Sequence, residues 1–494
     1  MNFSKKHIFL MAGPLAFLIL QGFNPPAGMP DSAFSMLGIT LWMAIWWVTE
    51  AIPIGVTALL PIILFPLTGA VDLSTTTASF GHKYIFLYMG GFMLAIAIEK
   101  WNLHKRIALH VIRLIGTNVS KIILGFMVAT AFLSMWISNT ATSVMMLPIG
   151  MSIVAQLRDN PATIEDENLI FGKALMLGIA YSASIGGIAT LIGTPPNLVF
   201  AGYVEEVYGI EITFWQWAKW GLPIAIPLLF IAWIYLTRFA FKFKQKEFPG
   251  GRQEINQLLK QLGPMKKEEK IILGIFILTA FAWIGRSFIL QPFFPAIDDT
   301  IIAMCAGILL FTIPGSDKKE PLINWEDAVK LPWGIILLFG GGMALASGFE
   351  STGLAAWLGN QMTLLQGLAL IVLVVVIIAS VNFITEVTSN LATTAMLLPI
   401  LAPIAVGLNI NPYILMVATT VAASCAFMLP VATPPNAVVF GSGYLKISDM
   451  AKSGIWMNIF SIVFLTLMVY YMLPLVWDFH PREFSDFIMN KITK

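Results

Sequence analysis

Two short motifs place neutral oxygen-bearing side chains inside otherwise apolar stretches of the chain. They are Ser138-Asn139-Thr140 and Ser389-Asn390-Leu391. Hydroxyl, amide and backbone carbonyl oxygens suit a hard cation such as Na⁺. An Asn amide can also donate to an anion while its oxygen accepts. A single hydroxyl in a membrane helix often bonds only its own backbone or a neighbouring helix, but the duplication favours binding. Further hydroxyl side chains precede the motifs: Ser134, Thr385 and Thr388.

A second pair of motifs predicts two interrupted helices. Gly193-Thr194-Pro195-Pro196-Asn197 and Ala432-Thr433-Pro434-Pro435-Asn436 lie within apolar runs at 171–202 and 413–441. Two prolines remove two backbone donors and free carbonyls upstream, such as those of Gly193 and Ala432, to face a cation. The helix that begins after the break turns its positive dipole end, and its free N–H groups, toward an anion. A plain proline kink explains one such motif better than it explains two.

The composition requires a membrane environment for these motifs. Of 494 residues, 57% are apolar and 11% are charged, against about 25% charged in soluble domains. The net charge is +2 and the mean hydropathy is +0.81. We therefore expect an all-α polytopic membrane protein. The charge balance argues against nucleic-acid binding. Cys305 and Cys425 offer neither a disulfide framework nor a thiolate metal site.

The order of the motifs indicates an internal repeat. Gly90-Gly91 and Ala218-Lys219 in the first half recur as Gly340-Gly341 and Ala451-Lys452 in the second, in the same order as the motifs above. The runs 121–157 and 368–407 are too long for one helix and are cut by polar residues, which predicts two re-entrant hairpins. Each repeat then has five crossings plus a hairpin, so the second copy is inverted. Such a design is typical of a secondary transporter with its site near the membrane midplane.

Apolar runs and charges predict the boundaries and the orientation. The segment 241–270 holds eight Lys/Arg residues and is expected to be a cytoplasmic loop, with the N-terminus, which carries Lys5 and Lys6, on the same side. Eleven crossings then place the C-terminus outside. The expected parts are an N-terminal transmembrane helix in 1–32, a first repeat in 33–240, the loop 241–270, a second repeat in 271–480 and an extracytoplasmic tail in 481–494.

Carboxylates within or beside apolar segments are the other candidates for chemistry. Glu386 lies between Thr385 and Thr388 at the second hairpin tip. A proton or cation relay is one interpretation, but a structural hydrogen bond that holds the hairpin closed is favoured. The same structural interpretation is favoured for Glu50, Glu99 and Glu350.

At these motifs the sequence resembles the divalent anion/sodium symporter family, which contains sodium-coupled dicarboxylate and citrate carriers. The resemblance runs from about Trp47 to Gly454. It implies an inward and an outward hairpin, a homodimer formed through a scaffold domain, a transport domain that moves like an elevator, and at least two sodium sites. The first implied sodium site contains Ser134, Ser138, Asn139 and Gly193; the second contains Thr385, Thr388, Asn390 and Ala432. The implied substrate site contains Ser138, Asn139, Thr140, Thr194, Ser389, Asn390, Leu391, Thr433 and Pro434.

One departure from the family pattern concerns the substrate. Leu391 stands where many members have a hydroxyl residue, which makes that side of the pocket more apolar. The resemblance implies sodium-coupled symport of C4-dicarboxylates such as succinate, malate and fumarate across the plasma membrane. Sodium-independent exchange and transport of citrate or another divalent anion such as sulfate remain alternatives. An intramembrane enzyme is disfavoured because no His or paired acids lie beside the duplicated motifs. An ion channel is disfavoured because hairpins and breaks suit a closed binding site.

Overall fold

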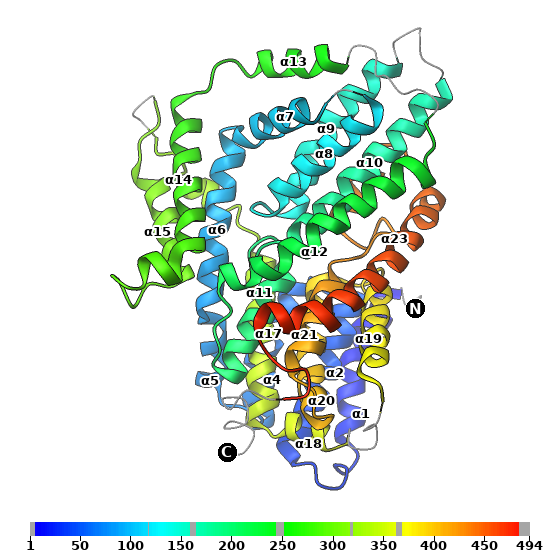
Figure 1. Cartoon of the computed structure of the whole chain (residues 1–494). Helices are drawn as coiled ribbons and strands as arrows, with labels where there is room; N and C mark the ends of the chain where they lie inside the picture. The colour runs from blue at the N-terminus through cyan, green and yellow to red at the C-terminus, as the bar shows by residue number, and fades with distance from the viewer. Residues whose placement is uncertain are drawn as a thin grey trace.

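The computed structural model describes residues 5–116, 118–158, 165–243, 251–316, 320–361 and 368–483, and these segments are helices joined by turns, with no β-strand among them (Figure 1). Eight described helical segments are long and apolar enough to cross a membrane. They are Asp31–Thr49, Leu73–Lys100, Asn168–Ile188, Phe214–Ala240, Lys267–Leu290, Trp333–Ser351, Asn390–Gly407 and Ile447–Trp477. An all-α polytopic membrane protein is therefore confirmed.

The described part of the chain before residue 241 forms fourteen helical elements. They are α1 (Lys5–Gln21), α2 (Asp31–Thr49), α3 (Ile54–Thr57), α4 (Leu60–Thr68), α5 (Leu73–Ala78), a 3₁₀ turn (Ser79–Gly81), α6 (Lys83–Lys100), α7 (Leu103–Ile115), α8 (Val119–Ser134), α9 (Asn139–Arg158), α10 (Glu165–Ile188), α11 (Pro195–Tyr208) and α12 (Phe214–Ile234), which continues as a π-helix over Tyr235–Ala240.

The described part of the second half also consists of helices. Its elements are α13 (Gly251–Gln261), α14 (Lys267–Gly285) with a π-helical end (Arg286–Leu290), α15 (Asp299–Thr312), α16 (Trp325–Ala328), α17 (Trp333–Ser351), α18 (Leu354–Gln361), α19 (Leu370–Ile384), α20 (Asn390–Gly407), α21 (Pro412–Ala423), α22 (Pro434–Phe440), α23 (Ile447–Leu467), a π-helix (Met468–Met472) and α24 (Leu473–Trp477).

Each predicted hairpin run is broken at its polar motif. The first run forms α8 and α9 with a break at 135–138, and the second forms α19 and α20 with a break at 385–389. The first helices of the pairs have 16 and 15 residues, which at 1.5 Å per residue reach about 24 Å and are short for a roughly 30 Å hydrocarbon core. Figure 1 shows the first pair in the upper half of the molecule and the second pair in the lower half.

Both predicted helix interruptions are also present. α10 ends at Ile188 and α11 begins at Pro195, while α21 ends at Ala423 and α22 begins at Pro434. Proline at the first helical positions has a φ angle that suits a helix start and carries no donor to leave unpaired. The residue before each Pro pair is extended, with φ −142° at Thr194 and at Thr433, as the steric demand of a following proline requires.

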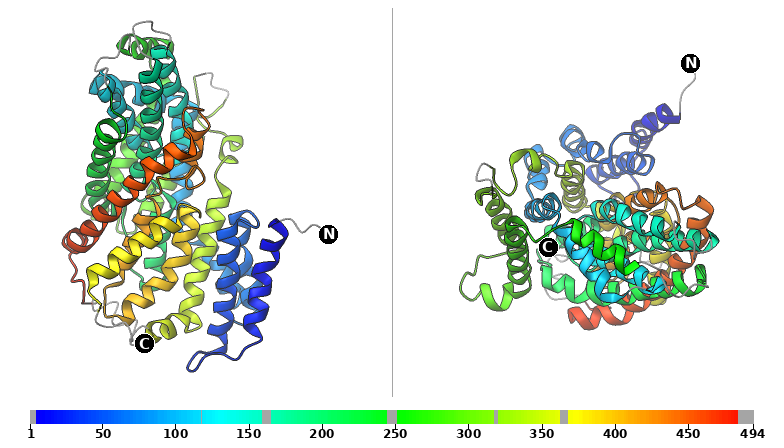
Figure 2. Two further views of the ribbon diagram at one scale, coloured as in Figure 1. Left: turned by 90° about the vertical axis from the view of Figure 1, so that its right-hand side faces the viewer. Right: turned by 90° about the horizontal axis from the view of Figure 1, so that it is seen from above.

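The interrupted helices interlock the two halves of the chain. α8 and α9 pack on α10, and α19 and α20 pack on α21, so each hairpin leans on the interrupted helix of its own half. The halves are then joined because α10 and α9 pack on α22, and α11 packs on α20 and α21. The two views of Figure 2 show this core with α1 and α2 along one side and α14 and α15 along another.

The expected loop at 241–270 is not wholly a loop. Residues 251–261 form α13, which lies across one end of the molecule (Figure 1), while residues 244–250 are outside the described part of the chain. Ile255 is fully buried whereas Gln257 is exposed, so one face of this short helix packs on the protein. The helix is held by Ser152 of α9, whose hydroxyl donates to Glu254 over 3.0 Å. Of the predicted tail, residues 484–494 are outside the described part.

Candidate functional site

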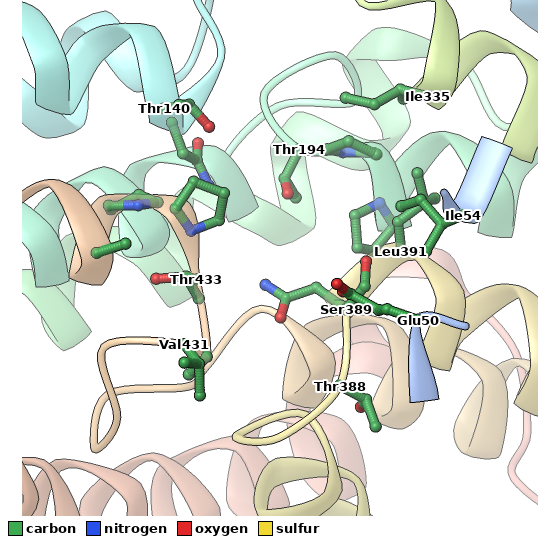
Figure 3. A pocket seen from close by; sticks show the side chains of 18 of the residues that line it. Glu50, Ile54, Thr140, Thr194, Ile335, Thr388, Ser389, Leu391, Val431 and Thr433 are labelled. Carbon is green, nitrogen blue, oxygen red and sulfur yellow. The ribbon is translucent and has the colours of Figure 1, made fainter. Parts of the chain in front are cut away.

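A cavity of about 730 Å³ lies where the two hairpin tips and the two helix breaks meet (Figure 3). The tips contribute 138–140 and 387–391, and the breaks contribute 194–196 and 430–435. These four segments are distant in the sequence, and only the interlocking of the halves brings them together. All nine residues predicted to bind substrate line this cavity: Ser138, Asn139, Thr140, Thr194, Ser389, Asn390, Leu391, Thr433 and Pro434.

The residues predicted to bind cations lie partly on the cavity wall and partly behind it. Ser138, Asn139, Thr388, Asn390 and Ala432 line the cavity. Ser134, Gly193 and Thr385 do not line it and are buried directly behind the two tips. The arrangement is therefore a shared cavity with one buried polar cluster beside each hairpin tip.

The first polar cluster joins the first tip to the first break. Ser134 Oγ lies 2.6 Å from the Asn139 side-chain amide and donates to the carbonyl oxygen of Ala183 over 2.7 Å. The inward amide atom of Asn139 also lies 3.2 Å from that carbonyl oxygen and 3.3 Å from the carbonyl oxygen of Gly193. Ser134 Oγ and the carbonyl oxygens of Ala183 and Gly193 therefore lie within 3.3 Å of this one amide atom, and uncharged oxygens of these kinds are the ligands that a hard cation takes. With the amide nitrogen inward, Asn139 cross-links the same groups.

The second polar cluster repeats this geometry. Thr385 Oγ1 donates to Asn390 Oδ1 over 2.7 Å and lies 3.1 Å from the carbonyl oxygen of Ala423. Thr385 thus takes the place that Ser134 has in the first cluster, and Asn390 takes that of Asn139. Thr388 is directed differently, because its hydroxyl bonds the carbonyl of Ile384 at 2.9 Å and Thr393 Oγ1 at 2.7 Å.

In each break an Asn side chain bonds backbone carbonyls of the segment that precedes it. Asn197 Nδ2 donates to the carbonyls of Gly187 and Thr190, and Asn436 Nδ2 donates to those of Ala426 and Leu429. Both side chains are fully buried, and in the described structure neither Oδ1 has a hydrogen-bond partner. Buried polar atoms are normally satisfied, so each break carries an unused oxygen beside its polar cluster.

Four helix N-termini border the cavity, those of α9, α11, α20 and α22. Pro195 and Pro196 begin α11, and Pro434 and Pro435 begin α22, so the first positions of these helices have no N–H to offer. The expectation of free donors at the breaks is therefore wrong for these positions; the breaks contribute dipoles and threonine hydroxyls. The hairpin helices α9 and α20 begin without proline, and their first N–H groups are the ones available to an anion.

Residues outside the two pairs of motifs complete the cavity wall. Val48, Thr49, Glu50, Ile54, Tyr88 and Ile335 come from α2, α3, α6 and α17 and the turns beside them. Glu50 is the one charged side chain among the described lining residues. It is exposed and has left-handed backbone angles, φ 45° and ψ 41°, an uncommon conformation for a residue with a side chain. Glu50 therefore borders the cavity, and its structural interpretation stays a prediction.

Paired interrupted helices around a polar cavity, in a chain rich in membrane-spanning helices, define a membrane transporter rather than an enzyme. The chain belongs to the family whose model is described as the sodium:sulfate symporter transmembrane region, and that model matches residues 4–477.

Similar proteins support this assignment. The chain is 47% identical over 471 residues to the sodium-dependent dicarboxylate transporter SdcS of Staphylococcus saprophyticus, covering 94% of this chain and 91% of the relative. It is 47% identical over 475 residues to the protein of the same name from Staphylococcus aureus strain USA300, covering 95% and 91%. These relatives are transporters, so the family resemblance and the exclusion of an enzyme are confirmed.

Solved structures share the fold at low identity. MtrF of Neisseria gonorrhoeae matches with a TM-score of 0.57 and 13% identity, covering 93% of this chain and 98% of that protein. The YdaH transporter of Alcanivorax borkumensis matches with a TM-score of 0.58 and 12% identity, covering 91% and 99%. At such identities the likeness concerns the fold alone.

Proposed function

We propose that this protein is a sodium-coupled symporter of C4-dicarboxylates such as succinate, malate and fumarate in the plasma membrane. The observation that carries the proposal is the convergence of both Ser-Asn tips and both Thr-Pro-Pro breaks on one cavity of about 730 Å³. The names of the two staphylococcal relatives, at 47% identity over almost the whole chain, support sodium and a dicarboxylate as the transported pair.

The cavity suits an anion that has two separated charged ends. Its described lining contains no Lys or Arg, so a bound anion is neutralised by co-bound cations and by helix dipoles. Two tips on different sides of the cavity, Ser138-Asn139-Thr140 and Ser389-Asn390, offer hydroxyl and amide donors to one carboxylate each. A dicarboxylate has one charged end for each tip, whereas sulfate has a single charged centre, and this favours the dicarboxylate.

The two polar clusters fit sodium. Each contains a hydroxyl, an Asn amide and at least one backbone carbonyl, and among these contacts there is no His, Cys or carboxylate. Such uncharged oxygen sets suit a hard monovalent ion. We therefore propose one sodium beside Ser134, Ser138, Asn139 and Gly193, and a second beside Thr385, Thr388, Asn390 and Ala432.

The matched geometry of the two halves also supports an inverted repeat with eleven crossings and two re-entrant hairpins. On this proposal the hairpins and the interrupted helices α10–α11 and α21–α22 form a transport domain. The remaining helices form a scaffold through which two copies pair. Glu50 and Tyr88 then belong to the scaffold wall, past which the site moves as an elevator.

Uptake of labelled succinate into proteoliposomes tests the proposal directly. We expect uptake with an inward sodium gradient and none with potassium in its place. Unlabelled fumarate and malate should compete more strongly than citrate or sulfate. Exchange of internal for external succinate at full rate without sodium would reject coupling in favour of an exchanger, and stronger competition by sulfate would reject the dicarboxylate.

A substitution at Leu391 tests which anion the cavity prefers. Leu391 lines the cavity beside Ser389 and is 5% exposed (Figure 3). Leu391→Thr adds a hydroxyl that can bond an additional oxygen of a larger acid. A hydrogen bond to a charged group contributes roughly 1.5–3 kcal/mol, so the ratio of citrate to succinate inhibition constants should shift toward citrate by about tenfold or more. An unchanged ratio in a folded variant would place Leu391 outside the substrate site.

The orientation can be tested at α13. Gln257 is on the exposed face of this helix, and the surrounding segment is rich in Lys and Arg. In a Cys305→Ser background, a cysteine replacing Gln257 should resist an impermeant maleimide in intact cells and react after permeabilisation. A cysteine replacing Asn24, in the turn between α1 and α2, is the matched control that should react in intact cells. Labelling in the opposite order would invert the proposed topology.

A further inference from the structure

Glu386 is a buried carboxylate that five hydrogen bonds hold in place. Its Oε1 accepts from the backbone N–H groups of Phe427 at 2.8 Å and Met428 at 3.0 Å. Its Oε2 accepts from those of Met428 and Leu429, both at 3.1 Å. Asn458 Nδ2 of α23 donates to Oε1 over 2.7 Å. The side chain is only 3% exposed, and each of these partners is a donor, which matches a carboxylate.

These bonds join three elements that the sequence separates. Glu386 is in the tip between α19 and α20, its three backbone donors are in the unwound segment between α21 and α22, and Asn458 is on α23. The helix α21 has already ended at Ala423, so the N–H groups of Met428 and Leu429 have no helical acceptor and bond Glu386 instead, while that of Phe427 also lies 3.3 Å from Asn458 Oδ1. The carboxylate thus pairs three successive backbone N–H groups of the long unwound segment.

In the first half of the chain, the contact between hairpin tip and helix break involves no charged side chain in the described structure. There, α10 remains helical to Ile188, so its break is shorter, and the tip residue Met135 offers only its carbonyl oxygen, which accepts a hydrogen bond from Thr190 Oγ1. The two polar clusters are alike, but the links that hold tip to break differ: backbone and hydroxyl in the first half, a carboxylate in the second.

We infer that Glu386 is a positioning residue that assembles the second cation site and that the two sites are consequently unequal. Its neighbour Thr385 bonds Asn390 and the carbonyl of Ala423, while Glu386 fixes the segment that leads to Ala432. Loss of the carboxylate releases that segment from the tip and disperses the second set of oxygens, and leaves the first set intact. This inference rests on the proposed sodium coupling, and it names Glu386 as the residue that organises the second site.

The test compares Glu386→Gln with the wild type by sodium-dependent thermal stabilisation of the purified protein and by sodium activation of succinate uptake. Gln turns one amide N–H₂ toward backbone donors, which leaves buried groups unpaired, so the sodium concentration for half-activation should rise by about tenfold or more. The Hill coefficient for sodium should fall toward one. The substrate affinity at saturating sodium should change by less than about twofold. Asn458→Ala, which removes one of the five bonds, should have a smaller effect in the same direction.

Double variants separate positioning from general destabilisation. Glu386→Gln combined with Thr385→Ala should weaken sodium stabilisation no more than the stronger single change, because both act on one site. Combined with Ser134→Ala, the effects should add, because that residue belongs to the other site. Glu350→Gln, an exposed carboxylate away from both clusters, is the matched control. If Glu386→Gln does not fold, the cycle is run with Asn458→Ala in its place.

Three outcomes would contradict the inference: an unchanged sodium response of Glu386→Gln, additivity with Thr385→Ala, or non-additivity with Ser134→Ala. Absence of any stabilisation of the wild type by sodium, with potassium as the reference, would instead reject the proposed coupling itself. The two failures are therefore distinguishable.

Discussion

Asn139→Ala is expected to reduce sodium-dependent succinate uptake to background. The Asn139 amide meets Ser134 Oγ at 2.6 Å and lies within 3.3 Å of the carbonyl oxygens of Ala183 and Gly193. Its removal deletes a proposed cation ligand and the contacts between the tip and the break. Each buried polar group left unpaired costs roughly 1–3 kcal/mol, so the affinity for sodium should fall by about a hundredfold or more. Asn390→Ala should do the same at the second site.

The matched control is Ser143→Ala on the same helix. Ser143 is buried as well, but its hydroxyl bonds only the backbone oxygen of Asn139 one turn earlier. This variant should keep uptake within about twofold of the wild type, because such a back-bond contributes little. Full uptake by purified Asn139→Ala with the sodium dependence of the wild type would remove Asn139 from the cation site.

Gly187→Ala should have the second-largest effect. A Cβ added at Gly187 would lie 2.6 Å from Oδ1 and 3.0 Å from Nδ2 of Asn139. These distances are too short for van der Waals contact, so the amide must move out of the first cluster. Overpacking a well-filled core costs typically 1–3 kcal/mol. We expect the sodium concentration for half-activation to rise by at least about tenfold, without any change of a ligand residue.

Gly91→Ala is the control for this steric argument. Gly91 is also a buried helical glycine, but the nearest atom to an added Cβ is Ile192 Cδ1 at 3.5 Å, an ordinary contact. Its sodium activation curve should superimpose on that of the wild type. If both alanine variants raise the sodium requirement equally, the effect of Gly187→Ala reflects lost helix flexibility and says nothing about Asn139.

The breaks and the tips are predictable from the sequence because their signals are local. Two consecutive prolines, as after Thr194 and Thr433, interrupt a helix. A Ser-Asn pair inside an apolar run likewise indicates a polar interruption from the sequence alone. Duplication then predicts that these four segments share a site. The length of the apolar runs likewise predicts helices, although several of those formed are shorter than a full crossing.

What escaped prediction depends on contacts between distant segments. Glu50 and Tyr88 come from other helices, and nothing local indicates that they face the cavity. Thr388 shares a motif with Thr385, yet its hydroxyl turns to Thr393. For Glu386 a structural hydrogen bond is the favoured prediction, but the sequence does not indicate its partners, because they are backbone groups of Phe427, Met428 and Leu429, whose side chains are apolar.

The interlocking of α9 and α10 with α22 has a consequence for biosynthesis. A nascent chain that ends before α13 already contains Ser134, Asn139 and Asn197, but α22, on which α9 and α10 pack, is not yet made. These contacts join residues hundreds of positions apart, so the cavity closes only after nearly the whole chain has entered the membrane. Until then the translocon and the lipid must accommodate polar groups that no protein covers.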